Sequence, residues 1–193
     1  PLIPEGVRNS ITAERSVSLT GSNASGKSTF IKTVALNAIL AQTLHTVLAE
    51  NYQASWFCIA SSMALRDDIL SQESYYIVEI RSLKRILDLT RSSELPVLCF
   101  IDEVLRGTNT VERIAASSRI LQSRAEEGGL CFAATHDIEL TYLLEKEYDN
   151  YHFEEQVEDD KVTFDYCLRE GRACTRNAIR LLKMLGYDEK IVD

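Results

Sequence analysis

The stretch GSNASGKS at residues 21–28 matches the pattern G-x-x-x-x-G-K-S of a phosphate-binding loop. Gly21 and Gly26 allow the backbone to bend so that successive N–H groups point inward at phosphate oxygens. Lys27 adds a positive charge that can reach the β- and γ-phosphates of a nucleoside triphosphate. Ser28 offers a hydroxyl oxygen to Mg²⁺. The stretch therefore predicts a loop that binds a nucleoside triphosphate together with Mg²⁺.

The residues on either side of this loop supply the strand and the helix that such a loop requires. Residues 16–20 read SVSLT, a β-strand in which Val17 and Leu19 are the buried positions. Residues 27–49 are mostly helix formers, so the phosphates would lie at a helix N-terminus, where backbone N–H groups favour anions. The alternative is a flexible loop without a ligand, and this context argues against it. The predicted nucleotide contacts are Gly21, Ser22, Asn23, Ala24, Ser25, Gly26, Lys27, Ser28 and Thr29.

The composition is that of a folded, acidic protein. The chain has 193 residues, which suggests one domain over residues 1–193, and 45% of its residues are apolar, which is typical of a globular protein. A net charge of −8 and a pI of about 5.0 argue against a broad DNA-binding face on this domain. Because the first residue is Pro1, we expect a fragment of a longer protein.

Cysteines and apolar runs bear on the compartment. The five cysteines form no C-x-x-C pair, so zinc is not expected, and Cys99 and Cys131 stand in apolar runs that suit a core. No apolar run approaches the roughly 20 residues that cross a membrane, and no secretory signal is visible. We therefore expect a cytoplasmic protein in a reducing environment.

Short apolar runs alternate with longer helical segments along the chain. Strands are predicted at residues 17–20, 56–60, 97–101 and 130–134, and helices at residues 27–49, 74–89, 110–127 and 137–147. The runs VLCFI (97–101) and LCFAA (130–134) are apolar without alternation, which suits strands buried on both faces of a parallel sheet. The order predicts an α/β fold with a largely parallel sheet flanked by helices.

The C-terminal part has a different pattern. Residues 151–158 and 161–168 flank two aspartates and predict a hairpin with an acidic turn. Residues 175–185 carry apolar side chains at helical spacing, and Gly186 is placed to end that helix. We expect a helical C-terminal part over about residues 172–193.

Two carboxylates follow the apolar run that ends at Ile101. A buried parallel strand delivers its last residues to the carboxyl edge of the sheet, beside the phosphate-binding loop. Asp102 would hold Mg²⁺, directly or through water, and Glu103 would act as general base towards the attacking water. The alternative, a solvated acidic strand end, is weakened by the phosphate-binding loop in the same domain.

His136 follows the apolar run 130–134 at the same predicted edge. A neutral imidazole there would sense the γ-phosphate or orient the water, although a lone histidine is more often structural. His45 and His152 have no such setting and are interpreted as ordinary helix and hairpin residues.

Two further segments have local explanations. Ser74 is a good N-cap for the helix predicted at 74–89, and Ser71 is an alternative. Thr108 or Thr110 can cap the helix predicted at 110–127, and Gly107 permits the turn before it. Segment 106–110 is also a candidate nucleotide-proximal or interface loop, because it follows the carboxylate pair.

Four ordered motifs together resemble the C-terminal ATPase domain of the MutS family, which belongs to the ABC-type ATPases. Residues 20–29, TGSNASGKST, are similar to TGPNMGGKST of that family. Residues 67–79, which include Ser74 and Glu79, resemble its DDL…S…MVE stretch. Residues 102–110, DEVLRGTNT, resemble DEIGRGTST, and residues 134–140 resemble ATHYFEL. The match runs nearly end to end.

This resemblance implies roles at matching positions. It implies a P-loop NTPase fold of the ABC type, ATP and Mg²⁺ as ligands, and a homodimer with ATP sandwiched between subunits. Ser74 would contact the γ-phosphate of ATP bound to the partner subunit, and His136 would be the switch histidine. Leu2 and Ile3 would contact adenine. The ATPase cycle would drive a DNA clamp, with DNA bound by regions of the parent protein outside this chain.

The chain also departs from the family motifs. Gln72 and Leu105 replace glycines, Tyr75 replaces a threonine, and Ser25 replaces a glycine of the phosphate-binding loop. These changes indicate a divergent member. Two alternatives stay open: another ABC-type ATPase of transport or chromosome maintenance, although LSGGQ does not occur, and an ATP-dependent dimerisation module with little turnover.

Overall fold

The computed structural model describes residues 6–63, 75–105, 108–158 and 161–173. Its strands are β1 (Ser16–Thr20), β2 (Cys58–Ser62), β3 (Val97–Asp102), β4 (Leu130–Ala134), β5 (Tyr148–His152), β6 (Glu155–Glu158), β7 (Lys161–Phe164) and β8 (Arg169–Glu170). Its helices are α1 (Lys27–Leu44), α2 (Tyr75–Ser92), α3 (Thr110–Glu126) and α4 (Ile138–Leu143).

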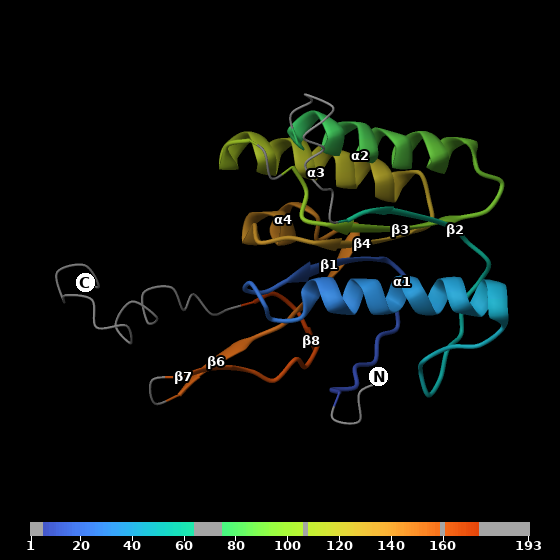
Figure 1. Ribbon diagram of the computed structural model, residues 1–193. Helices are drawn as coiled ribbons and strands as arrows, with labels where there is room; N and C mark the ends of the chain where they lie inside the picture. The colour runs from blue at the N-terminus through green and yellow to red at the C-terminus, as the bar shows by residue number, and fades with distance from the viewer. Residues whose placement is uncertain (1–5, 64–74, 106–107, 159–160, 174–193) are drawn as a thin grey trace.

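A six-stranded sheet organises the molecule. Its strand order is β2-β3-β4-β1-β5-β8, and every neighbouring pair is parallel except β5 with β8. Helix α1 covers one face of the sheet, and α2 and α3 cover the other (Figure 1). The predicted α/β fold with a mostly parallel sheet flanked by helices is therefore confirmed.

The central strands divide their side chains between two cores, as expected of strands buried on both faces. On β3, Cys99 and Ile101 pack beneath α2 and α3, whereas Leu98 and Phe100 pack towards α1. Phe100 stacks on Phe132 of β4, with ring centroids 5.6 Å apart. The apolar runs without alternation were therefore correctly interpreted.

The prediction failed at the strand after α4. The helix predicted to reach residue 147 ends at Leu143, and β5 then joins the sheet in parallel with β1. The hairpin is shorter than predicted, comprising only β6 and β7, and His152 belongs to β5 rather than to a hairpin. Strand β5 reads YDNYH, so it lacks the apolar run that marked the other strands.

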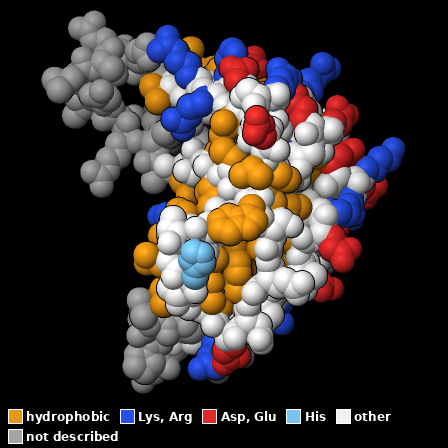
Figure 2. Space-filling view, turned by 90° about the vertical axis from the view of Figure 1, so that its right-hand side faces the viewer, with side chains coloured by type: hydrophobic (Ala, Val, Ile, Leu, Met, Phe, Trp, Pro, Cys, Tyr) orange, Lys and Arg blue, Asp and Glu red, His pale blue; other side chains and the backbone are white. Residues whose placement is uncertain are grey.

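Helix α1 ends five residues before its predicted boundary, at Leu44, where His45 takes a left-handed conformation with φ 53°. Side-chain amides of the helix hold the chain that folds back along it. The Asn37 carbonyl oxygen accepts the Leu48 N–H, and Gln42 bonds the backbone of Phe57. Hydrophobic side chains gather at the surface of this end of the molecule (Figure 2). The exposed large apolar residues of this segment are Leu44, Leu48, Tyr52 and Trp56.

Several predictions lie outside the described residues. They concern Leu2, Ile3, Ser71, Gln72, Ser74, Arg106, Gly107, the helix at 175–185 and the C-terminal part from residue 174 onward. Within the described ranges, no helix combines the length and the apolar character needed to cross a membrane.

Candidate active site

The loop predicted to bind phosphate, residues 21–28, lies between β1 and α1, as expected. Its backbone is left-handed at Gly21 (φ 144°), Ala24 (φ 64°) and Gly26 (φ 112°). A Cβ at Gly21 would lie 2.7 Å from the Phe153 carbonyl oxygen and 2.8 Å from Ser25 Oγ. Only glycine therefore fits at position 21, because both its φ and its close neighbours exclude a side chain.

Lys27 is the first residue of α1 and is 5% exposed. Its Nζ donates to the carbonyl oxygens of Gly21, at 2.7 Å, and Ser22, at 2.8 Å, so the loop curls around the ammonium group. Helix α1 has neither a side-chain cap nor an acidic residue in its first turn. The backbone N–H groups of this turn can therefore serve an anion.

The strand order brings the other predicted residues to the same edge. Strand β4 lies between β1 and β3, and backbone hydrogen bonds continue one residue beyond the ends of β4 and β3. The Thr135 N–H donates to the Leu19 carbonyl, and the Glu103 N–H donates to the Ala134 carbonyl, each at 3.0 Å. Because three parallel strands end side by side, the loop, the carboxylates and His136 share one edge of the sheet.

Asp102 is suited to hold a cation. Its Oδ1 is buried and has no hydrogen-bond partner among the described residues. Carboxylate oxygens are preferred ligands of Mg²⁺, which usually takes one or two of them and completes its shell with phosphates and water. The site therefore fits Mg²⁺ bound together with a phosphate ligand.

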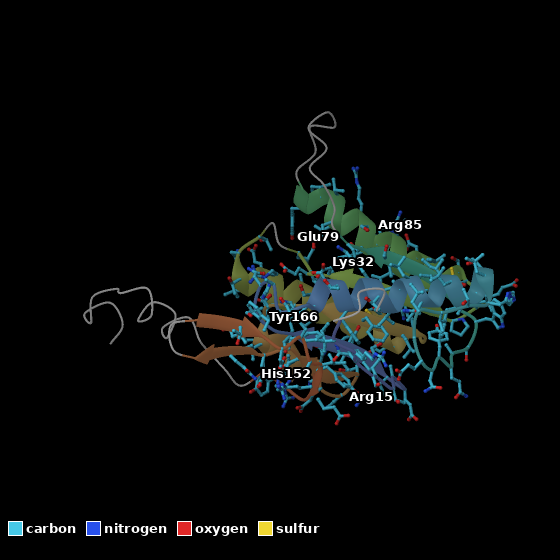
Figure 3. The ribbon with its side chains drawn as sticks, turned by 60° about the horizontal axis from the view of Figure 1, so that its bottom comes forward. Arg15, Lys32, Glu79, Arg85, His152 and Tyr166 are labelled. Atoms are coloured by element: carbon cyan, nitrogen blue, oxygen red, sulfur yellow. The ribbon has the colours of Figure 1, made fainter. Side chains whose placement is uncertain are left out.

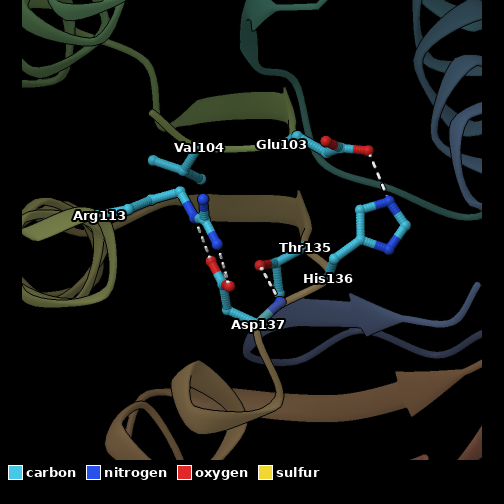
Figure 4. A pocket seen from close by; sticks show the side chains of 6 residues that line it. All are labelled: Glu103, Val104, Arg113, Thr135, His136 and Asp137. Carbon is cyan, nitrogen blue, oxygen red and sulfur yellow. Dashed lines mark hydrogen bonds and ion pairs between the residues drawn. The ribbon is translucent and has the colours of Figure 1, made fainter. Parts of the chain in front are cut away.

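Glu103 and His136 form a close pair. His136 Nε2 lies 2.8 Å from Glu103 Oε1, and their side chains are 34% and 17% exposed. Glu103 has a left-handed backbone with φ 60°, an uncommon conformation for a residue with a side chain. The pair lines a pocket of about 140 Å³, together with Val104, Thr135, Arg113 and Asp137 (Figure 4). The two predicted catalytic side chains therefore face each other directly.

Arg113 is a site residue that sequence reasoning missed. It lies in the first turn of α3 and bonds both oxygens of Asp137, with Nε–Oδ2 at 2.7 Å and Nη2–Oδ1 at 2.6 Å. These hydrogen bonds raise the pKa of Arg113, and the Glu103 carboxylate adds a smaller effect in the same direction. No local pattern joins residues 24 positions apart, so the sequence carried no signal for this pair.

Glu79 belongs to the segment that resembles DDL…S…MVE, but no role was predicted for it. It lies on α2, is 2% exposed, and its Oε1 accepts the backbone N–H of Leu105 at 2.5 Å. Leu105 has φ 58°, at the position where the resembling family motif has glycine. A signal was present: Glu79 falls on the apolar stripe of α2, three residues after Tyr76 and four before Leu83.

We expect Glu79→Ala to lower the free energy of unfolding by about 1–3 kcal/mol, because a buried N–H loses its acceptor. Glu79→Gln keeps a carbonyl oxygen for Leu105 and should cost less. Urea denaturation of both variants measures the difference. An equal loss in both would show that the charge of Glu79, rather than its bond to Leu105, stabilises this turn.

The aromatic side chain of Tyr166 lies against the phosphate-binding loop. A Cβ at Gly26 would be 3.4 Å from the Tyr166 ring, and the ring stacks on Phe164 with centroids 6.0 Å apart. Tyr166 is 45% exposed and lies beside the start of α1 (Figure 3). The residue was predicted only as part of a hairpin, and its place at the loop depends on how the chain returns after β7.

The N-cap of α3 differs from the predicted one. Neither Thr108 nor Thr110 caps this helix, because the Asn109 side chain accepts the Glu112 N–H at 3.0 Å. Thr108 instead donates its hydroxyl to the Glu112 carboxylate at 2.9 Å. Asn is as effective an N-cap as Ser or Asp, so the segment offered three candidates.

Comparison with known proteins shows similarity over almost the whole chain, beyond the four motifs. The family model described as MutS domain V matches residues 17–193. The DNA mismatch repair protein MutS of Natronomonas pharaonis is 35% identical over 179 residues, which is 91% of this chain and 21% of that protein. The DNA mismatch repair protein MutS 2 of Haloarcula marismortui is 32% identical over 91% of this chain and 19% of its own length.

A third relative has similar identity and coverage. The DNA mismatch repair protein MSH3 of Phaeosphaeria nodorum is 29% identical over 99% of this chain and 17% of its own length. The chain thus spans about a fifth of the length of these relatives. The family model covers far more than half of the chain, and the chain therefore belongs to the MutS family and matches its domain V.

Proposed function

We propose that this chain is an ABC-type ATPase domain that binds and hydrolyses ATP with Mg²⁺. The observation that carries the proposal is the convergence of three elements at one sheet edge. Three features lie there: the loop curled around Lys27, the Asp102 oxygen that has no hydrogen-bond partner among the described residues, and the Glu103–His136 pair. Phosphoryl transfer needs little more than positioned charges of this kind.

The residues of the loop would bind the triphosphate. Lys27 and the first-turn N–H groups of α1 supply positive charge to the phosphates, and Asn23 and Thr29 flank them. Ser28 and Asp102 would hold Mg²⁺, which when bound neutralises charge on the β- and γ-phosphates. Tyr166 offers a flat, half-exposed aromatic surface beside the loop, suited to stacking against the base.

Glu103 would act on the attacking water. A carboxylate within hydrogen-bond reach accepts a proton from water as the oxygen attacks phosphorus. His136 Nε2, at 2.8 Å, is placed to hold one oxygen of that carboxylate while the other receives the proton. The pair therefore combines a base with a group that orients it.

We further propose that two copies close on ATP and that this cycle drives a DNA clamp in a MutS-type protein. The support is the family and the printed names of its relatives, which are DNA mismatch repair proteins. Ser74 would reach the γ-phosphate across the dimer, and DNA would be bound by regions that the relatives have outside this domain.

Sedimentation velocity of Glu103→Gln tests the dimer. We expect a dimer with Mg-ATP and a monomer with Mg-ADP or without nucleotide, because only the γ-phosphate would bridge the two subunits. A dimer under all three conditions would show that the two copies associate without needing ATP. A monomer under all three, with ATP bound by calorimetry, would contradict the sandwich while leaving the nucleotide site intact.

A further inference from the structure

His136 lies between two residues that are each fixed in place. On one side, the Thr135 N–H bonds the Leu19 carbonyl of β1 and its side chain is buried. On the other side, the Asp137 N–H bonds Thr135 Oγ1 at 3.0 Å, and the Asp137 carboxylate is bound by Arg113. Only the imidazole of His136 extends from this clamped segment towards Glu103 (Figure 4).

Arg113 is itself held firmly. Its backbone N–H bonds the Asn109 carbonyl at 2.9 Å in the first turn of α3, a turn that the Asn109 side chain caps. The guanidinium uses Nε and Nη2 in a two-point contact with Asp137, which fixes orientation as well as distance. Arg113 therefore ties the start of α3 to the segment that carries His136.

The contact between Arg113 and Asp137 is largely shielded from solvent. Their side chains are 23% and 11% exposed, so this two-point ion pair can contribute to folding as well as to positioning. Asp137 also occupies the N-cap position of α4, yet its side chain makes no cap hydrogen bond. A capping aspartate typically stabilises a helix by about 1 kcal/mol. The Asp137 carboxylate instead bonds Arg113.

We propose that Arg113 is a positioning residue that, through Asp137, holds the His136 imidazole against Glu103. The expected effect on kcat rests on the proposed ATPase function, whereas the placement of His136 by Arg113 and Asp137 does not. Asp137 departs from the family motif, because ATHYFEL has tyrosine at this position. The link thus adds a contact from α3 to the catalytic pair.

A double-mutant cycle with His136 separates positioning from general stability. We expect Arg113→Met to lower kcat between about tenfold and about 10²-fold, the range expected from a small misplacement of a catalytic group, with the KM for ATP unchanged. In a His136→Ala background the same change should alter kcat by less than about twofold. Arg113→Lys keeps the charge but loses the two-point contact, so its kcat should lie between that of the wild type and that of Arg113→Met.

Nuclear magnetic resonance of the histidine rings gives a readout that needs no turnover. The chain has three histidines, so His136 is assigned by comparison with His136→Gln, and His45 and His152 act as internal references. We expect the ring nitrogen signals of His136 to report one ordered Nε2–H tautomer in the wild type. They should move to the exchange-averaged position in both Arg113→Met and Asp137→Asn.

Arg119→Met is the matched control, since Arg119 is an exposed arginine on the same helix. It should leave the His136 signals and kcat unchanged. Unmoved His136 signals in Arg113→Met, or an equal loss of kcat with and without His136, would overturn the proposal. If the wild type bound no ATP and showed no turnover while the His136 signals moved as expected, the proposed function would fail and the positioning role would stand.

Discussion

We expect Glu103→Gln to lower the rate of ATP hydrolysis by about 10²–10⁴-fold, the typical contribution of a general base, while ATP still binds. The side chain is only 17% exposed and its Oε1 lies 2.8 Å from His136 Nε2. Glutamine keeps the size of the side chain and an oxygen for His136, but it cannot accept a proton from water. Steady-state phosphate release measures the loss, and calorimetry measures ATP binding in the same preparation.

Glu126→Gln provides the matched control for this variant. Glu126 is an exposed residue at the end of α3, so the change removes one carboxylate charge away from the site. Its turnover should equal that of the wild type. Full turnover by Glu103→Gln would remove Glu103 from the role of base, and loss of ATP binding would show that the carboxylate mainly shapes the nucleotide site.

We expect Lys27→Ala to weaken ATP binding by roughly 10- to 100-fold, which corresponds to the roughly 1.5–3 kcal/mol of a hydrogen bond to a charged group. The ammonium group holds the carbonyl oxygens of Gly21 and Ser22 and would place its charge at the β- and γ-phosphates. The variant therefore loses both the shape of the loop and its charge. Isothermal titration calorimetry with Mg-ATP gives the dissociation constant directly.

Lys32→Ala is the control for charge alone. Lys32 is exposed on the same helix, one turn further from the loop, and lies by a separate apolar groove. Its removal should leave the affinity within about twofold of the wild type. Wild-type affinity in Lys27→Ala would exclude Lys27 as a phosphate ligand, and thermal unfolding shows whether each variant remains folded.

Local sequence was enough for the parts of the site that lie on consecutive residues. The loop at 21–28 has glycine at two of its three positive-φ positions, and Gly21 is held where a Cβ would meet Phe153 and Ser25. The runs ending at Ile101 and Ala134 are apolar on both faces, so their burial in a parallel sheet was predictable. Asp102, Glu103 and His136 followed from the ends of those runs.

The contacts that complete the site come from segments far apart in the chain. Strand β5 was missed because its burial depends on pairing with β1, and its own residues are mostly polar. Glu79 bonds Leu105, 26 residues away, and Arg113 bonds Asp137, 24 residues away. The sequence marks neither pair as partners, although the place of Glu79 on the apolar stripe of α2 did indicate that this residue is buried.

The sequence by itself determined the glycine-containing loop between β1 and α1, the buried strands and the acidic and histidine side chains at the strand ends, because each depends on neighbouring residues and their periodicity. The tertiary structure alone decided that β4 lies between β1 and β3, which places His136 at 2.8 Å from Glu103, and that α2 and α3 each send one side chain to hold that edge. Strand order and helix packing are set by the burial of apolar surface over the whole chain, and no local pattern encodes them.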